Sequence, residues 1–418
     1  MTSIADPSAA PSTSLAAPID PSRRIEALDI VRGFALFGVL LLNMVDFGGP
    51  AASFEPWAVS TGWWDRLVEL GIRVGGEAAF YTTFSFLFGL GFALQFQRAL
   101  DRGERFGWRF ASRLTVLAGF GLIHGFLIWS GDILLQYAVA GFFLLLFAKV
   151  GPRAALRWAM GLGAFSILLL TTVFALIYLD GVEPATAADI DAEIAFHAGS
   201  FTDIAAERLD GWVGTVVETL VGVPWFLSLF LVGLWAVRSG TLADWRNQAD
   251  RYRSILRVSV PIAIAAKGAL AVAIIIGADG VASTFGTVAS IAVGGPALGA
   301  TYVCLLLLAL RRVPDGTHVL RHLGPVGRMA LTNYLTQSVV AVLLFYGYGL
   351  GWYGRFGVGT TIGFTLAIFA AQIVVSRLWL DRFRFGPMEW LWRTLTYRGP
   401  LVSDRPMVDA PAAPELSR

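Results

Sequence analysis

The sequence predicts an all-α integral membrane protein, a polytopic bundle of about ten transmembrane helices. Three observations lead to this fold class. Of the 418 residues, 56% are hydrophobic and only 15% are charged, whereas roughly 25% of the residues of a soluble domain are charged. Apolar runs of about 20 residues, the length that crosses a bilayer, recur along almost the whole chain. Basic and acidic loops also alternate, as they do when successive loops lie on opposite sides of a membrane.

Apolar length and helix-breaking residues place the individual spans. Ser130 and Gly131 separate the third span from the fourth, and an acidic segment, residues 180–212, separates the fifth from the sixth. In that segment the spacing of Ile190 and Ile194 predicts a short helix on the membrane surface. The spans are expected near residues 30–48, 75–97, 112–129, 132–148, 155–179, 213–237, 256–277, 284–310, 326–349 and 358–380.

The spans form two halves flanked by tails. We expect an N-terminal transmembrane half over residues 25–237 and a C-terminal half over residues 238–398. Residues 1–24 are rich in Ala, Pro and Ser and lack a signal-peptide pattern, so they are predicted to be a disordered cytoplasmic tail. Residues 399–418 are predicted to be a second one.

Loop charge predicts the orientation, because short cytoplasmic loops carry excess Lys and Arg. The acidic segment lies on the opposite side from the basic loops, so both termini are expected in the cytoplasm. All but two of the 32 basic residues are Arg, which is typical of a GC-rich bacterial genome. The loops after spans two, four, six and eight contain Arg98, Arg102, Arg105, Arg109, Lys149, Arg153, Arg238, Arg246, Arg251, Arg253, Arg311, Arg312 and Arg321.

Several functional classes are disfavoured. A net charge of +2 with scattered arginines argues against nucleic-acid binding. The single cysteine, Cys304, rules out an internal disulfide and a cysteine metal cluster. His318 and His322 are four residues apart, but that spacing alone is a weak metal signal, and we expect no metal site. The glycines of FGLGF, residues 88–92, lie inside a span, where they favour close helix packing over phosphate binding.

Ionisable groups at membrane depth are candidate functional residues, because placing them there costs free energy. Glu77 is expected to begin the second span, where its charge suits a helix N-terminus. Glu218 lies near the outer end of the sixth span. Lys267, near the middle of the seventh, is too deep to reach the interface and needs a partner. Glu218 is the predicted partner, either in a structural ion pair or in a polar path.

The segment GFGLIHGFLIWSGDILLQYA, residues 119–138, contains His124 and Asp132. In one straight helix the two residues would lie about 12 Å apart. The Ser130-Gly131 break instead predicts two antiparallel helices, which allow the side chains to approach. Asp132 is then expected to orient one imidazole nitrogen while the other faces a cavity, as in a general base. The alternatives are that Asp132 only caps its helix and that His124 is an interhelical hydrogen bonder.

Several motifs resemble one family. EALDIVRGFALFGVLLLN (26–43), FSFLFGLGFAL (84–94) and GLIHGFLIWSGDILLQYA (121–138) resemble the N-terminal half of YeiB-like bacterial membrane proteins. GPVGRMALTNYLTQS (324–338) and RFRFGPMEWLWRTLTY (382–397) resemble the C-terminal half, catalogued as a domain of unknown function. The resemblance implies an inner-membrane helical protein that is distantly similar to transmembrane acyltransferases. Those enzymes use a histidine in or just after the first span, where this chain has Asn43 and Asp46 instead.

The resemblance and the residues together suggest a membrane-bound acyltransferase. His124, oriented by Asp132, would act as base toward a small-molecule acceptor, and Arg98 and Arg102 would attract an anionic donor such as acyl coenzyme A, unless these arginines only determine topology. Asn333 and Gln337, four apart on one helical face, would line the same cavity, although interhelical hydrogen bonding explains them equally well.

The alternative function is transport or export of a small solute. In that reading Lys267, Glu218 and Glu77 form a polar path through the bilayer. The chain shows no internal repeat of the kind found in many transporters. A structural or signalling membrane component is a third reading, since no established catalytic motif is present.

Overall fold

The computed structural model describes residues 26–50, 62–179, 186–241, 245–277, 280–313 and 319–397. Both predicted tails, residues 180–185 of the acidic segment, and His318 lie outside these residues. Over the described residues the chain is helical and contains no β-strand. The all-α prediction is therefore confirmed.

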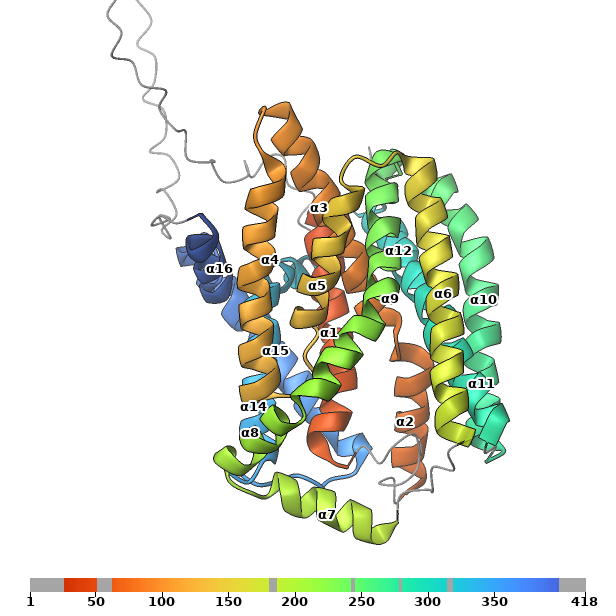
Figure 1. Cartoon of the computed structure of the whole chain (residues 1–418), viewed down its shortest axis with the longest axis vertical. Coiled ribbons are helices and arrows are strands. Elements are labelled where there is room, and N and C mark those ends of the chain that lie inside the picture. The colour runs from red at the N-terminus through yellow and green to blue at the C-terminus, as the bar shows by residue number, and fades with distance from the viewer. Residues whose placement is uncertain are drawn as a thin grey trace, which may run out of the picture.

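The longer helices lie side by side in a bundle (Figure 1). Short π-helical and 3₁₀ segments interrupt or join them. The α-helices are α1 (Glu26–Gly48), α2 (Trp63–Gly76), α3 (Ala79–Asp101), α4 (Phe106–Ile123), α5 (Leu134–Leu144), α6 (Pro152–Leu179), α7 (Ala187–His197), α8 (Phe201–Asp210), α9 (Trp212–Arg238), α10 (Ala249–Ile275), α11 (Gly280–Ala289), α12 (Gly295–Leu310), α13 (Leu323–Arg328), α14 (Ala330–Phe345), α15 (Val358–Arg382) and α16 (Pro387–Tyr397). The other segments are η2 (His124–Ile128), η3 (Leu145–Phe147), η4 (Trp245–Asn247), η5 (Ser290–Gly294) and η6 (Val319–His322).

Among the described residues, eight helical stretches are long and apolar enough to cross a membrane. Each overlaps a predicted span, and together they indicate a multipass membrane protein whose apolar surface contacts lipid. Two shorter apolar helices, Leu134–Phe147 and Ala330–Phe345, coincide with the fourth and ninth predicted spans.

The bundle has two chemically distinct ends. The basic end is where α3 ends and α4 begins, with Arg98, Arg102 and Arg109, and the acidic end is where α7 and α8 lie across the bundle (Figure 1). As predicted, Ile190 and Ile194 belong to a short helix, α7. A capping box starts this helix, in which Thr186 and Asp189 each bond the other's backbone N–H.

Two glycines allow α3 and α9 to pack closely. A Cβ placed on Gly89 would lie 1.9 Å from the carbonyl oxygen of Phe230, and one on Gly233 would lie 2.2 Å from that of Phe86. No side chain fits at either crossing point. The prediction that the FGLGF motif serves helix packing is confirmed at Gly89.

The second predicted span is broken near its start. α2 ends at Gly76 and α3 starts at Ala79, and between them Ala78 adopts a left-handed conformation with φ of 62°. Glu77 therefore does not begin a single span, as the sequence predicted, but lies in the break between α2 and α3. Its backbone N–H still bonds to the carbonyls of Ile72 and Arg73.

Candidate functional site

A helical hairpin brings His124 and Asp132 together. α4 passes into the π-helical segment η2, which starts at His124, and the chain turns back into α5. The His124 Nδ1 and Asp132 Oδ1 atoms are 2.8 Å apart. Gly121 permits this approach, because a Cβ there would lie 2.4 Å from the backbone nitrogen of Leu135. The predicted contact is confirmed.

The Asp132 carboxylate has two structural tasks at once. Oδ1 accepts the hydrogen bond from His124, and Oδ2 accepts from the backbone N–H of Leu135 in the first turn of α5 at 2.8 Å. Asp132 therefore both caps the start of α5 and holds the His124 ring, so both predicted contacts of this carboxylate are present. Because the carboxylate only accepts, His124 donates from Nδ1. When the imidazole is neutral, its Nε2 then has the lone pair.

The surroundings of His124 differ from the prediction in one respect. The side chain has no exposed surface, and Nε2 forms no hydrogen bond within the described chain. The Tyr334 ring of α14 lies against the imidazole with the ring centroids 5.1 Å apart. Nε2 was expected to face a cavity, but His124 is not among the residues that line the large cavity of the bundle.

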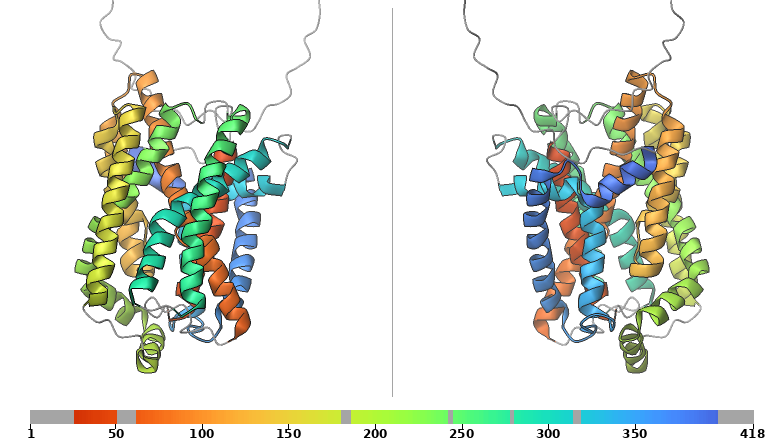
Figure 2. Two further views of the ribbon diagram at one scale, coloured as in Figure 1. Left: turned by 90° about the vertical axis from the view of Figure 1, so that its right-hand side faces the viewer. Right: turned by 90° about the vertical axis from the view of Figure 1, so that its left-hand side faces the viewer.

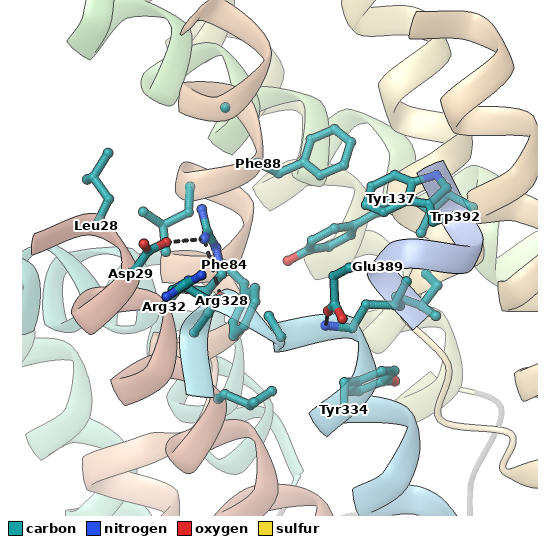
Figure 3. Close-up of a pocket in the computed structure, with 18 of the residues that line it drawn as sticks. Leu28, Asp29, Arg32, Phe84, Phe88, Tyr137, Arg328, Tyr334, Glu389 and Trp392 are labelled. Carbon is teal, nitrogen blue, oxygen red and sulfur yellow. Dashed lines mark hydrogen bonds and ion pairs between the residues drawn. The ribbon is translucent and has the colours of Figure 1, made fainter. Parts of the chain in front are cut away.

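A cavity of about 1700 Å³ extends through the bundle from the basic end toward the acidic end. Asp132 and Tyr334 form part of its wall, and Phe84, Phe88 and Tyr137 give its middle an aromatic lining. Figure 3 shows Tyr334, Glu389 and Trp392 on one side of it and Asp29 with Arg32 on the other. Arginines line it as a group, namely Arg32, Arg98, Arg102, Arg109, Arg113, Arg321, Arg328, Arg377, Arg384 and Arg393.

The other end of the cavity is polar but not basic. Asn43 and Asp46 from α1 line it there, together with Gln136 and Glu218, whose side chains are hydrogen-bonded at 3.1 Å. Arg98 and Arg102 thus share one cavity with Glu218 and Asp132. Arg98 lies at the end of α3 and Arg102 directly follows it, Glu218 lies in α9, and Asp132 lies in the turn before α5.

The comparisons with known proteins show the family. A model described as "Protein of unknown function (DUF418)" matches residues 236–399. "Uncharacterized protein YxaH" of Bacillus subtilis (strain 168) is 34% identical over 90% of this chain and 95% of that protein. "Uncharacterized protein YeiB" of Escherichia coli (strain K12) is 31% identical over 90% of this chain and 97% of that protein. The chain belongs to the YeiB-like family.

Two YeiB-like motifs, residues 324–338 and 382–397, meet at the cavity wall. Glu389 of α16 lies at the start of α14, where Oε1 accepts from the N–H groups of Leu331 at 2.7 Å and Thr332 at 3.1 Å. Its Oε2 accepts from the Thr332 hydroxyl at 2.6 Å. Glu389 thus caps α14 from another helix, which satisfies donors that α14 itself cannot. Burial raises the pKa of its carboxyl above the ordinary value despite these bonds.

The same α16 is also attached to α4. The Trp392 indole donates to the carbonyl of Arg113 at 2.9 Å, and the Arg113 guanidinium lies 4.5 Å from the centre of the Trp392 ring. Figure 2 shows α16 lying at an angle to the long helices. Through this helix the YeiB-like motif 382–397 connects α4, which leads to His124, with α14, which contains Tyr334.

Asn333 and Gln337 do not line the cavity. Asn333 Nδ2 donates to Ser376 of α15 at 2.9 Å, and Gln337 Nε2 donates to Gln372 of α15 at 2.8 Å. The expectation that they line the cavity is wrong, because their side chains turn toward α15. Asn333 and Gln337 instead form hydrogen bonds between α14 and α15, which was the alternative prediction.

Lys267 is buried, but its partner is not Glu218. Its ammonium donates to the backbone carbonyl of Glu77 and to the Ser290 hydroxyl, both at 2.7 Å. Ser290 donates in turn to the Glu77 carboxylate at 3.3 Å. The predicted Lys267–Glu218 pair is therefore wrong, because the break after α2 frees a carbonyl for the ammonium while Glu218 bonds Gln136.

Tyr334, Glu389 and Trp392 line the cavity but were not predicted as site residues from the sequence. All three lie in the motifs quoted for the family, and Glu389 follows a Gly-Pro pair that marks a helix start. That signal predicts a helix at 387–397, but it does not indicate which other helix the carboxylate caps.

Proposed function

We propose that this YeiB-like protein is an acyltransferase of the bacterial inner membrane. It takes an acyl group from an anionic cytoplasmic donor such as acyl coenzyme A and transfers it to a hydroxyl or amine of a small-molecule acceptor. The observation that carries the proposal is the cavity of about 1700 Å³ whose wall contains both the arginines of the basic end and the Asp132 carboxylate that holds His124.

The arginines support the donor class. Guanidinium groups bind phosphate oxygens through paired hydrogen bonds, and coenzyme A carries several phosphate oxygens. The basic end is the cytoplasmic one in this proposal, because arginine-rich loops stay on that side. The donor enters there and extends its thioester toward the aromatic middle of the cavity, near Phe84 and Phe88.

The His124–Asp132 pair supports the chemistry. An imidazole held in one tautomer by a carboxylate accepts a proton at its other nitrogen and is stabilised when charged. The proton of the acceptor's hydroxyl or amine has to go to such a base as its oxygen or nitrogen attacks the thioester. The buried position of His124 keeps this charge out of bulk water.

The test uses the full chain, purified into lipid nanodiscs, with radiolabelled acetyl coenzyme A. We expect binding of the donor and transfer of label to an added amine or alcohol, with His124→Ala slowing transfer by about 100-fold or more. Tyr302→Phe is the control, because Tyr302 bonds Gly75 away from the cavity. Unchanged transfer by His124→Ala contradicts the role of His124, and absence of donor binding contradicts the donor class.

One observation favours transport as a second function. Lys267 and Ser290 are buried and bond Glu77 where α2 and α3 are separated and where η5 lies between α11 and α12. Interrupted helices at membrane depth form binding sites in transporters. To test this function, a pH-sensitive dye inside proteoliposomes measures proton flux. We expect the wild type to give flux without forming an acylated product, and Lys267→Met to abolish the flux. Equal flux through wild type and Lys267→Met contradicts it.

A further inference from the structure

The large cavity has room for more than one ligand. Its volume is about 1700 Å³, whereas most small-molecule sites have roughly 300–1,000 Å³. The arginines that line it favour an anionic ligand at the basic end. The end away from the arginines, which we call the polar end, is therefore a second candidate binding site.

Side chains from three helices line the polar end. Asn43 and Asp46 are three residues apart on one face of α1, Gln136 belongs to α5, and Glu218 belongs to α9. Each of these side chains has at least one oxygen that accepts hydrogen bonds, and two of the four are carboxylates. The polar end thus combines hydrogen-bond acceptors with negative charge.

The Glu218 carboxylate is held in the cavity wall by one of its oxygens. Gln136 Nε2 donates to Oε1 at 3.1 Å, whereas Oε2 forms no hydrogen bond or ion pair with any described residue. Glu218 belongs to a helix long and apolar enough to cross a membrane. A carboxylate at membrane depth costs free energy unless water or a cation stabilises its charge, so Oε2 is a place for a positively charged donor.

Asp46 is a second carboxylate without a cation. Protein atoms surround this side chain on nearly all sides, and its accessible surface faces the cavity. It forms no hydrogen bond or ion pair with another described residue. Arg73 is near enough to act on its charge, but that guanidinium bonds Glu69 at 3.1 Å. Since Glu77 and Glu193 add negative charge around Asp46, the field at this place favours a cationic ligand.

Carboxylates at the basic end of the cavity differ in this respect. Asp29 forms an ion pair with Arg32 at 2.9 Å. Glu104 forms one with Arg109. The cavity therefore neutralises carboxylates at its basic end with its own arginines, whereas the two carboxylates of the polar end have no ion-pair partner within the described chain.

We infer that the polar end binds a small molecule that carries an ammonium group, with Glu218 and Asp46 as its counter-charges. A primary ammonium has three N–H donors, which suit Glu218 Oε2 and the amide oxygens of Asn43 and Gln136. In the proposed acyl transfer this molecule is the acceptor, and that part of the inference rests on the proposed function. Since a bound ammonium nitrogen has no lone pair, the group acylated is another hydroxyl or amine of the same molecule.

The test measures binding without an acyl donor. With the full chain in phosphatidylcholine nanodiscs, saturation-transfer NMR compares ethanolamine, which is protonated at pH 7, with ethylene glycol, which has a hydroxyl in place of the ammonium. Empty nanodiscs give the background. We expect ethanolamine to bind about ten times more tightly than ethylene glycol or better, because a hydrogen bond between two charged groups is the stronger one. Equal binding of the two probes overturns the site.

Two variants keep the shape of a side chain and remove its charge. We expect Glu218→Gln and Asp46→Asn each to weaken ethanolamine binding by about tenfold or more, with thermal unfolding as a check of the fold. Glu218→Asp keeps the charge and should bind more tightly than Glu218→Gln. Glu207→Gln is the matched control, because Glu207 is exposed on α8 at the acidic end and is not part of the cavity wall.

The outcomes separate this site from the proposed function. A folded Glu218→Gln or Asp46→Asn variant that binds ethanolamine like wild type overturns the site, as does an equal loss in Glu207→Gln. If the expected binding is found but labelled acetyl coenzyme A transfers no acetyl group to ethanolamine, the acyl transfer is contradicted and the ammonium site stands.

Discussion

Hydrogen bonds of single side chains connect neighbouring helices of this protein. Lys267 has four methylenes between its ammonium and the backbone, and the ammonium is satisfied by one carbonyl and one hydroxyl instead of by a carboxylate. Asp132 uses its two oxygens for two different partners. In both cases an irregularity of the backbone provides the partner. The break after α2 leaves the Glu77 carbonyl for Lys267, and the hairpin leaves the Leu135 N–H for Asp132.

Gly89 provides a test at the residue scale. Gly89→Ala places a methyl group 1.9 Å from the Phe230 carbonyl oxygen, so α3 and α9 have to separate. We expect a loss of about 1 to 3 kcal/mol, typical of an overpacked contact, seen as a lower midpoint of thermal unfolding in detergent. Gly91→Ala is the matched control, since its nearest neighbour, Gln95 Nε2, is 3.9 Å away and alanine favours a helix. Equal midpoints for both variants contradict this account of the crossing.

At the scale of elements, short helices fix the positions of long ones. α16 bonds α14 through Glu389 and α4 through Trp392. At the acidic end α7 is held in a similar way, because the His197 ring stacks on Tyr353 with the centroids 4.1 Å apart and the His197 carbonyl accepts from Gly347 at 2.8 Å. α8 extends this contact to the hairpin, since Arg208 donates to the carbonyl of Ile128 at 2.8 Å.

The docking of α7 is expected to depend on pH. Burial lowers the pKa of the His197 imidazole below its ordinary 6.5, so the docked helix favours the neutral ring. Above 6.5 the ring is neutral whether α7 is docked or released, and docking keeps its full stability. As the pH falls below about 6.5, the released helix binds a proton that the docked helix does not, and docking weakens. Glu193, Arg208 and the Tyr353 ring face the imidazole in the docked state.

Amide hydrogen exchange of residues 187–197 measures this effect. After correction for the intrinsic rate, we expect faster exchange at pH 5.5 than at pH 7.5. His197→Phe keeps a flat ring for the Tyr353 contact but has no titrating nitrogen, so its corrected exchange should not change between the two values. A wild type that is as protected at pH 5.5 as at pH 7.5 would show that His197 does not control docking.

At the scale of the whole molecule, apolar length predicted the spans because it is a local property that the bilayer itself selects. The contact of His124 and Asp132 was also predicted from local sequence, because the two residues lie on either side of the same turn at Ser130-Gly131. The partner of Lys267 was not, because it depends on a left-handed residue at Ala78 and on η5, more than 20 residues further along the chain. Tyr334 and Glu389 depend on helices that are neighbours in space but not in sequence.

The charge asymmetry of the whole bundle leads to the last prediction, its orientation. The arginine-lined mouth of the cavity and the acidic helices α7 and α8 lie at opposite ends. Since basic loops remain in the cytoplasm, we expect Asp101 inside the cell and Asp210 outside it. Cys304 is the one cysteine of the chain and is buried, so Cys304→Ser gives a background for placing single cysteines at these two exposed positions.

Intact cells treated with a membrane-impermeant maleimide should label Asp210→Cys, while Asp101→Cys should be labelled only after the membrane is opened. The orientation matters for the proposed reaction, because coenzyme A thioesters are cytoplasmic and have to enter where the arginines are. The reverse pattern, with Asp101→Cys labelled first, would place the arginines outside the cell. An acyl coenzyme A donor would then have no access to them, and the transport function would become the stronger of the two.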